Sequence, residues 1–180
     1  MKHAPHGAKF QKIQVKRVDF LSAVLARLSD DVGTVLDLID QRNEAAERKI
    51  GFWASIRMVM PIVEAVAGAV GETPQEVLGQ HLGIATPYLA WDLFRHSLAH
   101  GDYLQTGEYE GKKVGWGVFL SAGHTFGDGK IHISVRSLYE ALREYLETQI
   151  GKQDETLVDV EVGVLYSEPW QNVIDDFAKL

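Results

Sequence analysis

The chain has 180 residues, of which 46% are hydrophobic and 24% charged, and its formal net charge at pH 7 is −7. This composition predicts a folded domain, and the acidic charge argues against a large nonspecific nucleic-acid surface. The lack of cysteine excludes disulfides and thiolate metal ligands. The first residues lack the apolar core of a secretory signal, and the longest apolar run is too short to span a bilayer. We therefore expect a cytoplasmic protein without a membrane partner.

Charge is distributed unevenly along the chain. Residues 1–17 contain five basic residues and no acid, whereas residues 152–180 contain seven acids and two lysines. A basic terminus of this kind is typical of a frayed, solvated segment. The alternative is that it adds contacts to a local phosphate site.

The first half of the chain has the apolar periodicity of helices. It predicts helices over residues 19–28, 32–48 and 50–70. Pro61 should kink or break the third of these helices because proline has no backbone donor, and Gly71 should end it.

Two Thr-Pro pairs predict further helix starts. In TPQE, residues 73–76, the threonine can cap the helix and the glutamate can close a capping box. This short helix should end near Gly83. The pair TP at 86–87 repeats the arrangement and opens a helix that Gly101 ends.

Alternating strand patterns appear in the second half. Residues 114–120 and 130–135 predict two antiparallel strands of a β-hairpin, at about 113–135, whose loop contains Asp128-Gly129. A helix should start at Ser137, in a second capping box, and stop at Gly151. Residues 158–164 then alternate as a half-exposed strand, and residues 169–178 are weakly helical.

These elements predict a mainly α fold in a single domain, residues 1–180. Its parts are a helical bundle at about 18–150, the inserted β-hairpin, and a C-terminal extension at about 151–180 with an additional strand. No Gly-rich phosphate loop or nucleophile-elbow motif is present in the sequence.

The sequence LFRHSLAHGDY, residues 93–103, has the highest density of reactive side chains. Asp92, His96 and His100 are spaced four apart and share one face of a helix, as metal ligands can. His124 and Asp102 are candidates to complete such a site. The simpler interpretation is an exposed ladder in which Asp92 pairs with His96.

Arg95 and His100 form a second pattern, which suits cleavage of a phosphodiester. A guanidinium can hold two phosphate oxygens, and an imidazole that titrates near neutrality can transfer a proton. No metal or other cofactor is required, and the nucleophile is the 2′-hydroxyl of RNA. On a straight helix the two side chains diverge by about 140°. They can meet only if the helix distorts near Gly101, or if two copies of the chain pair across a two-fold axis.

The sequence FRHSLAHG resembles the arginine–polar–four-to-six–histidine motif of HEPN domains (higher eukaryotes and prokaryotes nucleotide-binding). Arg95, His96, His100 and Gly101 match the motif. The resemblance implies a helical bundle, often a homodimer with the motif at its interface. Many members are metal-independent endoribonucleases of toxin–antitoxin, defence or RNA-processing systems.

The resemblance also implies roles for individual residues. Arg95 binds the scissile phosphate, His100 acts as general acid or base, and His96 orients the phosphate or His100. Asp102, Ser97 and Asp92 are candidates for supporting roles, with Asp102 tuning the pKa of His100. RNA is the expected partner, and any antitoxin or other protein partner is a separate chain.

Three alternatives remain open at this point. The same fold can serve as a non-catalytic module that binds nucleotides or proteins. The histidines and carboxylates can instead bind a metal. In a purely structural interpretation, Arg95 pairs with Asp92 or Asp102, and His100 lies in the last helical turn, where the helix dipole favours a cation.

Overall fold

The computed structural model of the chain describes all residues except 1–7, 45–51, 98–106, 110, 120–122 and 166–180. Its contacts divide the chain into two compact units. The larger unit is Arg17–Glu155, and the smaller one combines Met1–Lys16 with Thr156–Leu180. The described residues are mainly helical, with small sheets, which confirms the mainly α prediction.

The larger unit begins with three consecutive helical segments: α1 (Arg17–Arg27), the π-helical η1 (Leu28–Gly33) and α2 (Thr34–Glu44). Two helices were predicted here, and the π-helical segment joins them without a loop. Gly33 is buried, and a Cβ at this position would lie 2.8 Å from the hydroxyl of Tyr139. The absence of a side chain therefore permits the close approach of Tyr139.

The long apolar helix α3 (Phe52–Val70) continues through Pro61, so the predicted break at this residue is wrong. One side of α3 is buried, and the other side, which carries Pro61, is exposed. Gly71 follows with φ of +80°, a conformation that favours glycine, and confirms the predicted stop. Among the described residues, no single helix is long and apolar enough to cross a membrane. Residues 54–70 of α3 and the helical segment Pro74–His81 reach that length and apolarity only when taken together, and the chain bends by 110° between them.

The capping box predicted at TPQE is present. Thr73 accepts from the backbone N–H of Glu76 over 3.2 Å, and the Glu76 carboxylate accepts from the backbone N–H of Thr73 over 2.7 Å. The chain continues as α4 (Pro74–Glu76) and the π-helical η2 (Val77–His81).

The second Thr-Pro pair opens α5 (Pro87–Trp91), which continues as the π-helical η3 (Asp92–Ser97). The expected cap is absent. The side chain of Thr86 makes no capping bond, and its buried Oγ1 has no partner among the described residues. The predicted end of this helix at Gly101 lies outside the described residues.

A mixed sheet contains β2 (Gly107–Tyr109), β3 (Lys112–Phe119), β4 (Thr125–Gly127) and β5 (Lys130–Ser134), in the order β2-β3-β5-β4. The predicted antiparallel pairing of the two long strands is wrong, because β3 and β5 are parallel.

The turn itself was predicted correctly. Asp128 and Gly129 have φ of 51° and 67°, and they join β4 to β5 with Gly127 opposite Lys130. A two-residue turn fixes the register of its immediate neighbours, so the strand across it is β4. Three residues are too few to show an alternating pattern, which is why this strand was not predicted.

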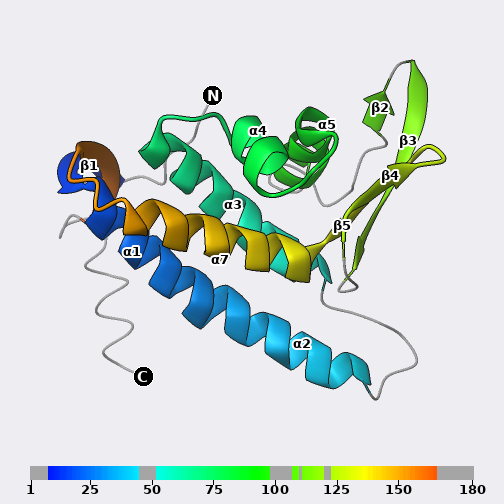
Figure 1. Cartoon of the computed structure of the whole chain (residues 1–180), viewed down its shortest axis with the longest axis horizontal. Helices are drawn as coiled ribbons and strands as arrows, with labels where there is room; N and C mark the ends of the chain where they lie inside the picture. The colour runs from blue at the N-terminus through cyan, green and yellow to red at the C-terminus, as the bar shows by residue number, and fades with distance from the viewer. Residues whose placement is uncertain (1–7, 45–51, 98–106, 110, 120–122, 166–180) are drawn as a thin grey trace. The chain divides into compact units, whose positions relative to one another are not determined.

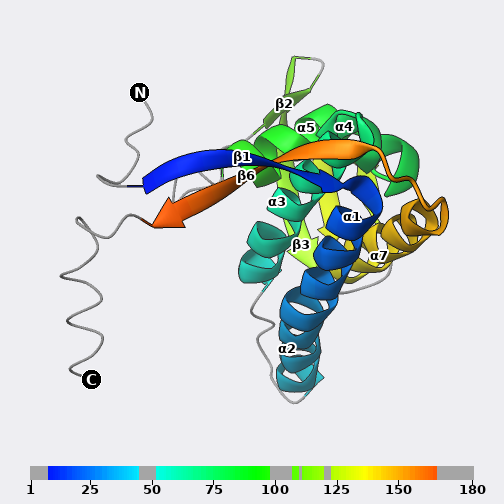
Figure 2. The same cartoon turned by 90° about the vertical axis from the view of Figure 1, so that its left-hand side faces the viewer.

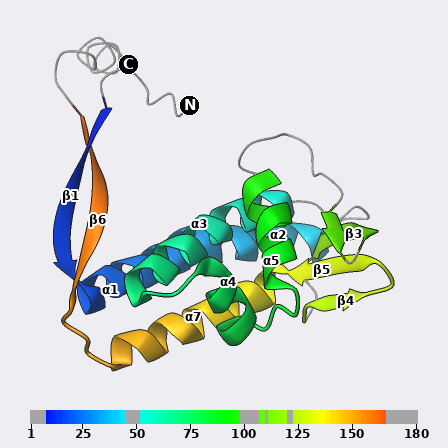
Figure 3. The same cartoon turned by 90° about the horizontal axis from the view of Figure 1, so that it is seen from above.

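The helix α7 (Val135–Gly151) follows β5 directly and ends at Gly151, as predicted (Figure 3). Its start differs from the prediction. The N-cap is Ser134, whose Oγ accepts from the backbone N–H of Ser137 over 3.2 Å, so the cap lies three residues before the predicted one. Burial explains the choice, since Ser134 is fully buried and ends a strand whose apolar residues are also in the core.

The core of the larger unit lies where α7 packs against α1 and α3 (Figure 1). Polar contacts at the edges connect α7 to α2, and α1 to the residues that follow α7. Arg136 of α7 pairs with Asp37 and Asp40 of α2, and Arg17 pairs with Asp154. The largest fully buried side chains are Phe94, Leu21, Leu28, Leu36, Ile56, Met60, Leu78, Ile133, Leu138, Leu142 and Leu146.

The smaller unit contains an antiparallel pair, β1 (Ala8–Lys16) and β6 (Leu157–Leu165), shown in Figure 2. The strand predicted at 158–164 is confirmed. The prediction of a frayed terminus is wrong for residues 8–16, because they pair along their whole length with β6. Lysine and glutamine alternate with apolar residues over residues 12–16 of β1, and this alternation was the signal in the sequence.

Candidate functional site

Arg95 forms an ion pair with Glu64 of α3. Its Nε and Nη2 both donate to Oε2 of Glu64, over 3.1 and 2.9 Å. The Arg95 side chain is 26% exposed and that of Glu64 is 50% exposed. Because one edge of the guanidinium serves the carboxylate, the edge that carries Nη1 is directed away from Glu64.

The local sequence explains why Arg95 lies at the surface. Leu93 and Phe94, which precede it, are 2% and 1% exposed and anchor η3 in the core. Glu64 is the single acid of α3 and lies on the exposed side of that helix. The core therefore positions η3 so that the guanidinium meets the carboxylate at the edge.

Glu64 was not predicted as a site residue. The expected partners of Arg95 were Asp92 and Asp102, which are close to it in sequence. The signal was one carboxylate in an otherwise apolar segment, MVMPIVEAVAGAV, where an acid needs either solvent or a cation. The contact spans 31 residues, and no periodicity within one helix can predict it.

The π-helical segment η3 includes Arg95 and ends at Ser97, before the other residue of the motif, His100. A π-helix bonds residue i to residue i+5, so residues five apart lie closer to one line than they do in an α-helix. Arg95 is part of such a segment. The described chain contains three π-helical segments, so this geometry alone does not identify a site.

The other predicted site residues differ in how much of each the structure describes. Asp92 is exposed at the start of η3 and has an interaction partner. His96 and Ser97 are in η3, but their side chains lie outside the described part of the structure, as do His100 and Asp102 entirely. The contact between Arg95 and His100 thus stays a prediction.

Within the described residues, no group of three or more histidines and carboxylates is arranged to hold a metal ion. His124, a candidate metal ligand, has other partners. Its Nδ1 accepts from the backbone N–H of Ser134 over 3.2 Å. Burial lowers the pKa of His124, and a hydrogen bond to the backbone of Leu82 acts in the opposite direction. The ring of His124, which immediately precedes β4, therefore contacts two backbone segments.

A second titratable cluster joins the ends of α3 and η2 to α7. The carboxylate of Glu72 accepts from the hydroxyl of Tyr145 and contacts Nε2 of His81, both at 3.1 Å. The imidazole of His81 stacks on the ring of Tyr145 with centroids 4.2 Å apart. Burial raises the pKa of Tyr145, and the charge of Glu72 raises it further. These contacts therefore stabilise the packing of Glu72 and η2 against α7.

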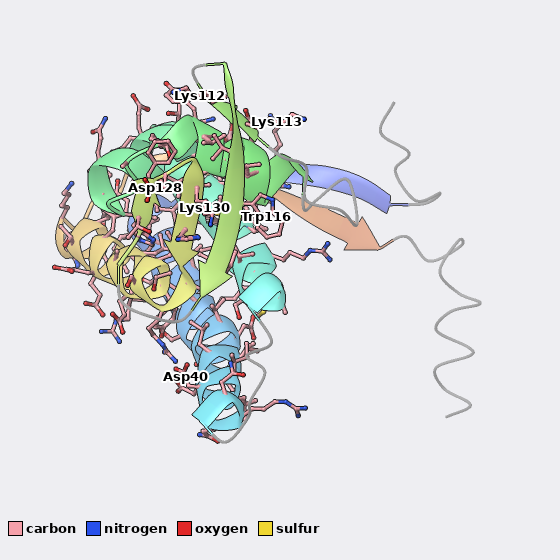
Figure 4. All side chains as sticks on the ribbon, turned by 90° about the vertical axis from the view of Figure 1, so that its right-hand side faces the viewer. Asp40, Lys112, Lys113, Trp116, Asp128 and Lys130 are labelled. Atoms are coloured by element: carbon pink, nitrogen blue, oxygen red, sulfur yellow. The ribbon has the colours of Figure 1, made fainter. Side chains whose placement is uncertain are left out.

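The mixed sheet carries exposed positive charge. Figure 4 shows Lys112 and Lys113 at the start of β3, Lys130 on the adjacent β5 and Asp128 in the turn. The three lysines are exposed. Lys113 and Lys130 lie on the same face of the sheet, because Gly115 is opposite Lys130, and they provide a cationic surface on the larger unit in a chain whose overall charge is negative.

Comparison of the chain with protein-family models, curated proteins and solved structures finds no match. The resemblance to HEPN domains therefore depends on residues 94–101.

Proposed function

We propose that this chain is a HEPN-like helical bundle that acts as a metal-independent endoribonuclease, with two copies forming the active unit. The observation that carries the proposal is the surface guanidinium of Arg95, which the core and Glu64 hold with one edge directed away from the carboxylate. An oriented and permanently charged fork suits two oxygens of a phosphodiester.

In the proposed reaction, Arg95 binds the scissile phosphate and stabilises the charge that develops on its oxygens. A histidine removes the proton from the 2′-hydroxyl, and the 2′-oxygen bonds to phosphorus while the bond to the 5′-oxygen breaks. The products are a 2′,3′-cyclic phosphate and a 5′-hydroxyl, which receives a proton from a general acid. His100 supplies one of these proton transfers, and His96 orients the phosphate or His100.

The divergence expected on a straight helix has to be removed, either by distortion of the helix near Gly101 or by the pairing of two copies. Supporting roles fall to Asp92, Ser97 and Asp102. A separate antitoxin or partner protein is proposed to regulate the enzyme. The cationic surface of Lys113 and Lys130 offers contacts to the backbone of a longer RNA.

Cleavage of labelled single-stranded RNA in the presence of a chelator tests the proposal. We expect Arg95→Ala and His100→Ala each to abolish cleavage while the circular dichroism spectrum stays unchanged. Arg143→Ala is the matched control, since Arg143 is an exposed arginine that pairs with Glu147 on α7. Replacing the scissile 2′-hydroxyl by hydrogen should also prevent cleavage. Cleavage by both variants at the rate of the unsubstituted chain would contradict the proposal.

The second candidate is a non-catalytic binding module on the same helical unit. The carboxylate of Glu64 favours it, because a neutralised arginine contributes to packing without binding a phosphate. Binding of RNA without cleavage, unchanged in Arg95→Ala, would support this candidate.

A further inference from the structure

An apolar groove lies between α1 and α3 in the larger unit, with a volume of about 430 Å³. Mostly apolar side chains form its walls, and the charged groups at the groove come from Arg27, Asp31 and Arg57. The residues that line the groove are Phe20, Val24, Arg27, Asp31, Val32, Arg57, Met58, Pro61, Ile62 and Ala65. Clefts with this volume and mainly apolar walls are typical of binding sites.

The charged residues of the groove favour an acidic occupant. Arg57 is exposed and has no hydrogen-bond or ion-pair partner in the described part of the chain. Arg27 pairs with Asp31 over 3.3 Å, but their side chains are 78% and 56% exposed, so water screens this pair. Two guanidiniums against one carboxylate leave the groove with a net positive charge.

We propose that this groove binds residues 169–178 of a second copy of the chain. The sequence PWQNVIDDFAKL, which begins at Pro169, lies outside the described residues and was predicted to be weakly helical. Trp170, Val173, Ile174 and Phe177 follow the i, i+3, i+4, i+7 spacing with which an amphipathic helix fills a hydrophobic groove.

Dimensions and charge both match. Trp170 and Phe177 are about 10 Å apart along a helix axis, and the groove residues 57–65 of α3 span about 12 Å. On a helix Asp176 lies beside the apolar stripe of the segment, where it can face an arginine side chain at the rim, whereas Asp175 lies on the opposite side.

The choice of a second copy rests on the proposed function, which requires two copies to meet near Arg95. Pro61 lines the groove and precedes Glu64, the partner of Arg95, by three residues on the exposed side of α3. A segment from a second copy in this groove would place that copy beside the ion pair.

Peptide binding tests the groove directly. The receptor is the full chain with Trp170→Ala and Phe177→Ala, which leaves the groove vacant, and the probe is a fluorescent synthetic peptide of residues 166–180. We expect saturable binding that Ala65→Glu in the receptor weakens at least about tenfold. Ala54→Glu is the matched control, because Ala54 is exposed on α3 outside the groove, and it should change the affinity less than about twofold.

The charge argument has its own test. Arg57→Glu in the receptor should weaken binding, and a peptide with Asp176→Lys should recover part of the loss. A peptide of the same composition in scrambled order should not bind. Equal binding of the peptide by the Ala65→Glu and Ala54→Glu receptors would overturn the proposal.

Sedimentation equilibrium tests whether the segment in the groove comes from a second copy of the chain. The unsubstituted chain should dimerise, and both Ala65→Glu and the Trp170→Ala/Phe177→Ala chain should raise the dimer dissociation constant by roughly tenfold or more. A monomer at every concentration, or a dimer that neither change affects, would overturn the second copy as occupant. Neither readout involves RNA, so a failure of cleavage with peptide binding intact would count against the proposed function alone.

Discussion

Removal of the Glu64 carboxylate separates a structural from a functional role for the Arg95 pair. Water reaches both side chains, which are 26% and 50% exposed. An ion pair screened in this way contributes about 0.2–1 kcal/mol to the free energy of unfolding. For a domain of this size, a change of that magnitude lowers the melting temperature by at most about 4 °C.

The proposed positioning role predicts a much larger effect on RNA cleavage. Without the carboxylate, the guanidinium of Arg95 loses the contact that orients its free edge. A small displacement of a catalytic group reduces the rate on the order of 100-fold. Glu64→Ala should therefore lower kcat strongly and change KM little, and Glu64→Gln, which keeps an acceptor oxygen, should recover part of the activity.

Glu147→Ala is the matched control for both measurements. Glu147 pairs with Arg143 over 3.7 Å, with side chains 57% and 49% exposed. Its removal should change the melting temperature by a similar small amount and leave cleavage unchanged. A positioning role for Glu64 is contradicted if Glu64→Ala unfolds the chain at far lower temperature and cleavage falls only with the folded fraction. It is also contradicted if an active enzyme shows the same kcat with and without the carboxylate.

Three further predictions concern other described residues. Burial lowers the pKa of His124 below its ordinary 6.5, so the unfolded chain binds more protons in acid than the folded chain does. The free energy of unfolding should therefore fall as the pH drops below about 6.5. In urea unfolding, His124→Gln should show a smaller decrease over the same pH range. Thr73→Ala should lower the free energy of unfolding by about 1 kcal/mol, because the helix loses its cap. Thr86→Val should be neutral or stabilising, because it removes a buried hydroxyl that has no described partner. Charge reversal at Lys113 and Lys130 should weaken RNA binding and flatten its dependence on salt in titrations at several salt concentrations, with no effect if the sheet makes no contact with RNA.

The sequence predicted best where a feature depends on neighbours along the chain. The capping box at Thr73, the stop at Gly71 and the turn at Asp128 each depend on residues within a few positions. Apolar periodicity also predicted the main helices, because each helix buries one face whatever its partner is.

Features that depend on distant contacts were predicted poorly. Alternation indicates that β3 and β5 are strands, but it contains no information on their relative direction. Ser134 replaces Ser137 as the cap because burial of the strand before it sets where α7 begins. The continuation of α3 through Pro61 has a similar basis, since the packed face of the helix is opposite the proline.

In the candidate site, too, local features were predicted and a distant contact was not. The types of side chain at Arg95 and His100 suggested phosphodiester chemistry, and their spacing suggested that a straight helix would separate them. Neither observation could identify Glu64, because its contact with Arg95 depends on how η3 packs against α3.

Under the proposed function, this packing also bears on how an acidic chain binds RNA. A net charge of −7 repels a polyanion at long range, so affinity has to come from a few short-range contacts. The Arg95–Glu64 pair carries no net charge, so it adds little to long-range attraction, and the guanidinium acts on a phosphate only at hydrogen-bond distance. An arginine held in this way suits a substrate that approaches closely in a defined orientation, and it suits nonspecific attraction poorly. We therefore expect selectivity for particular RNA structures to depend more on Arg95 than on the exposed lysines of the sheet.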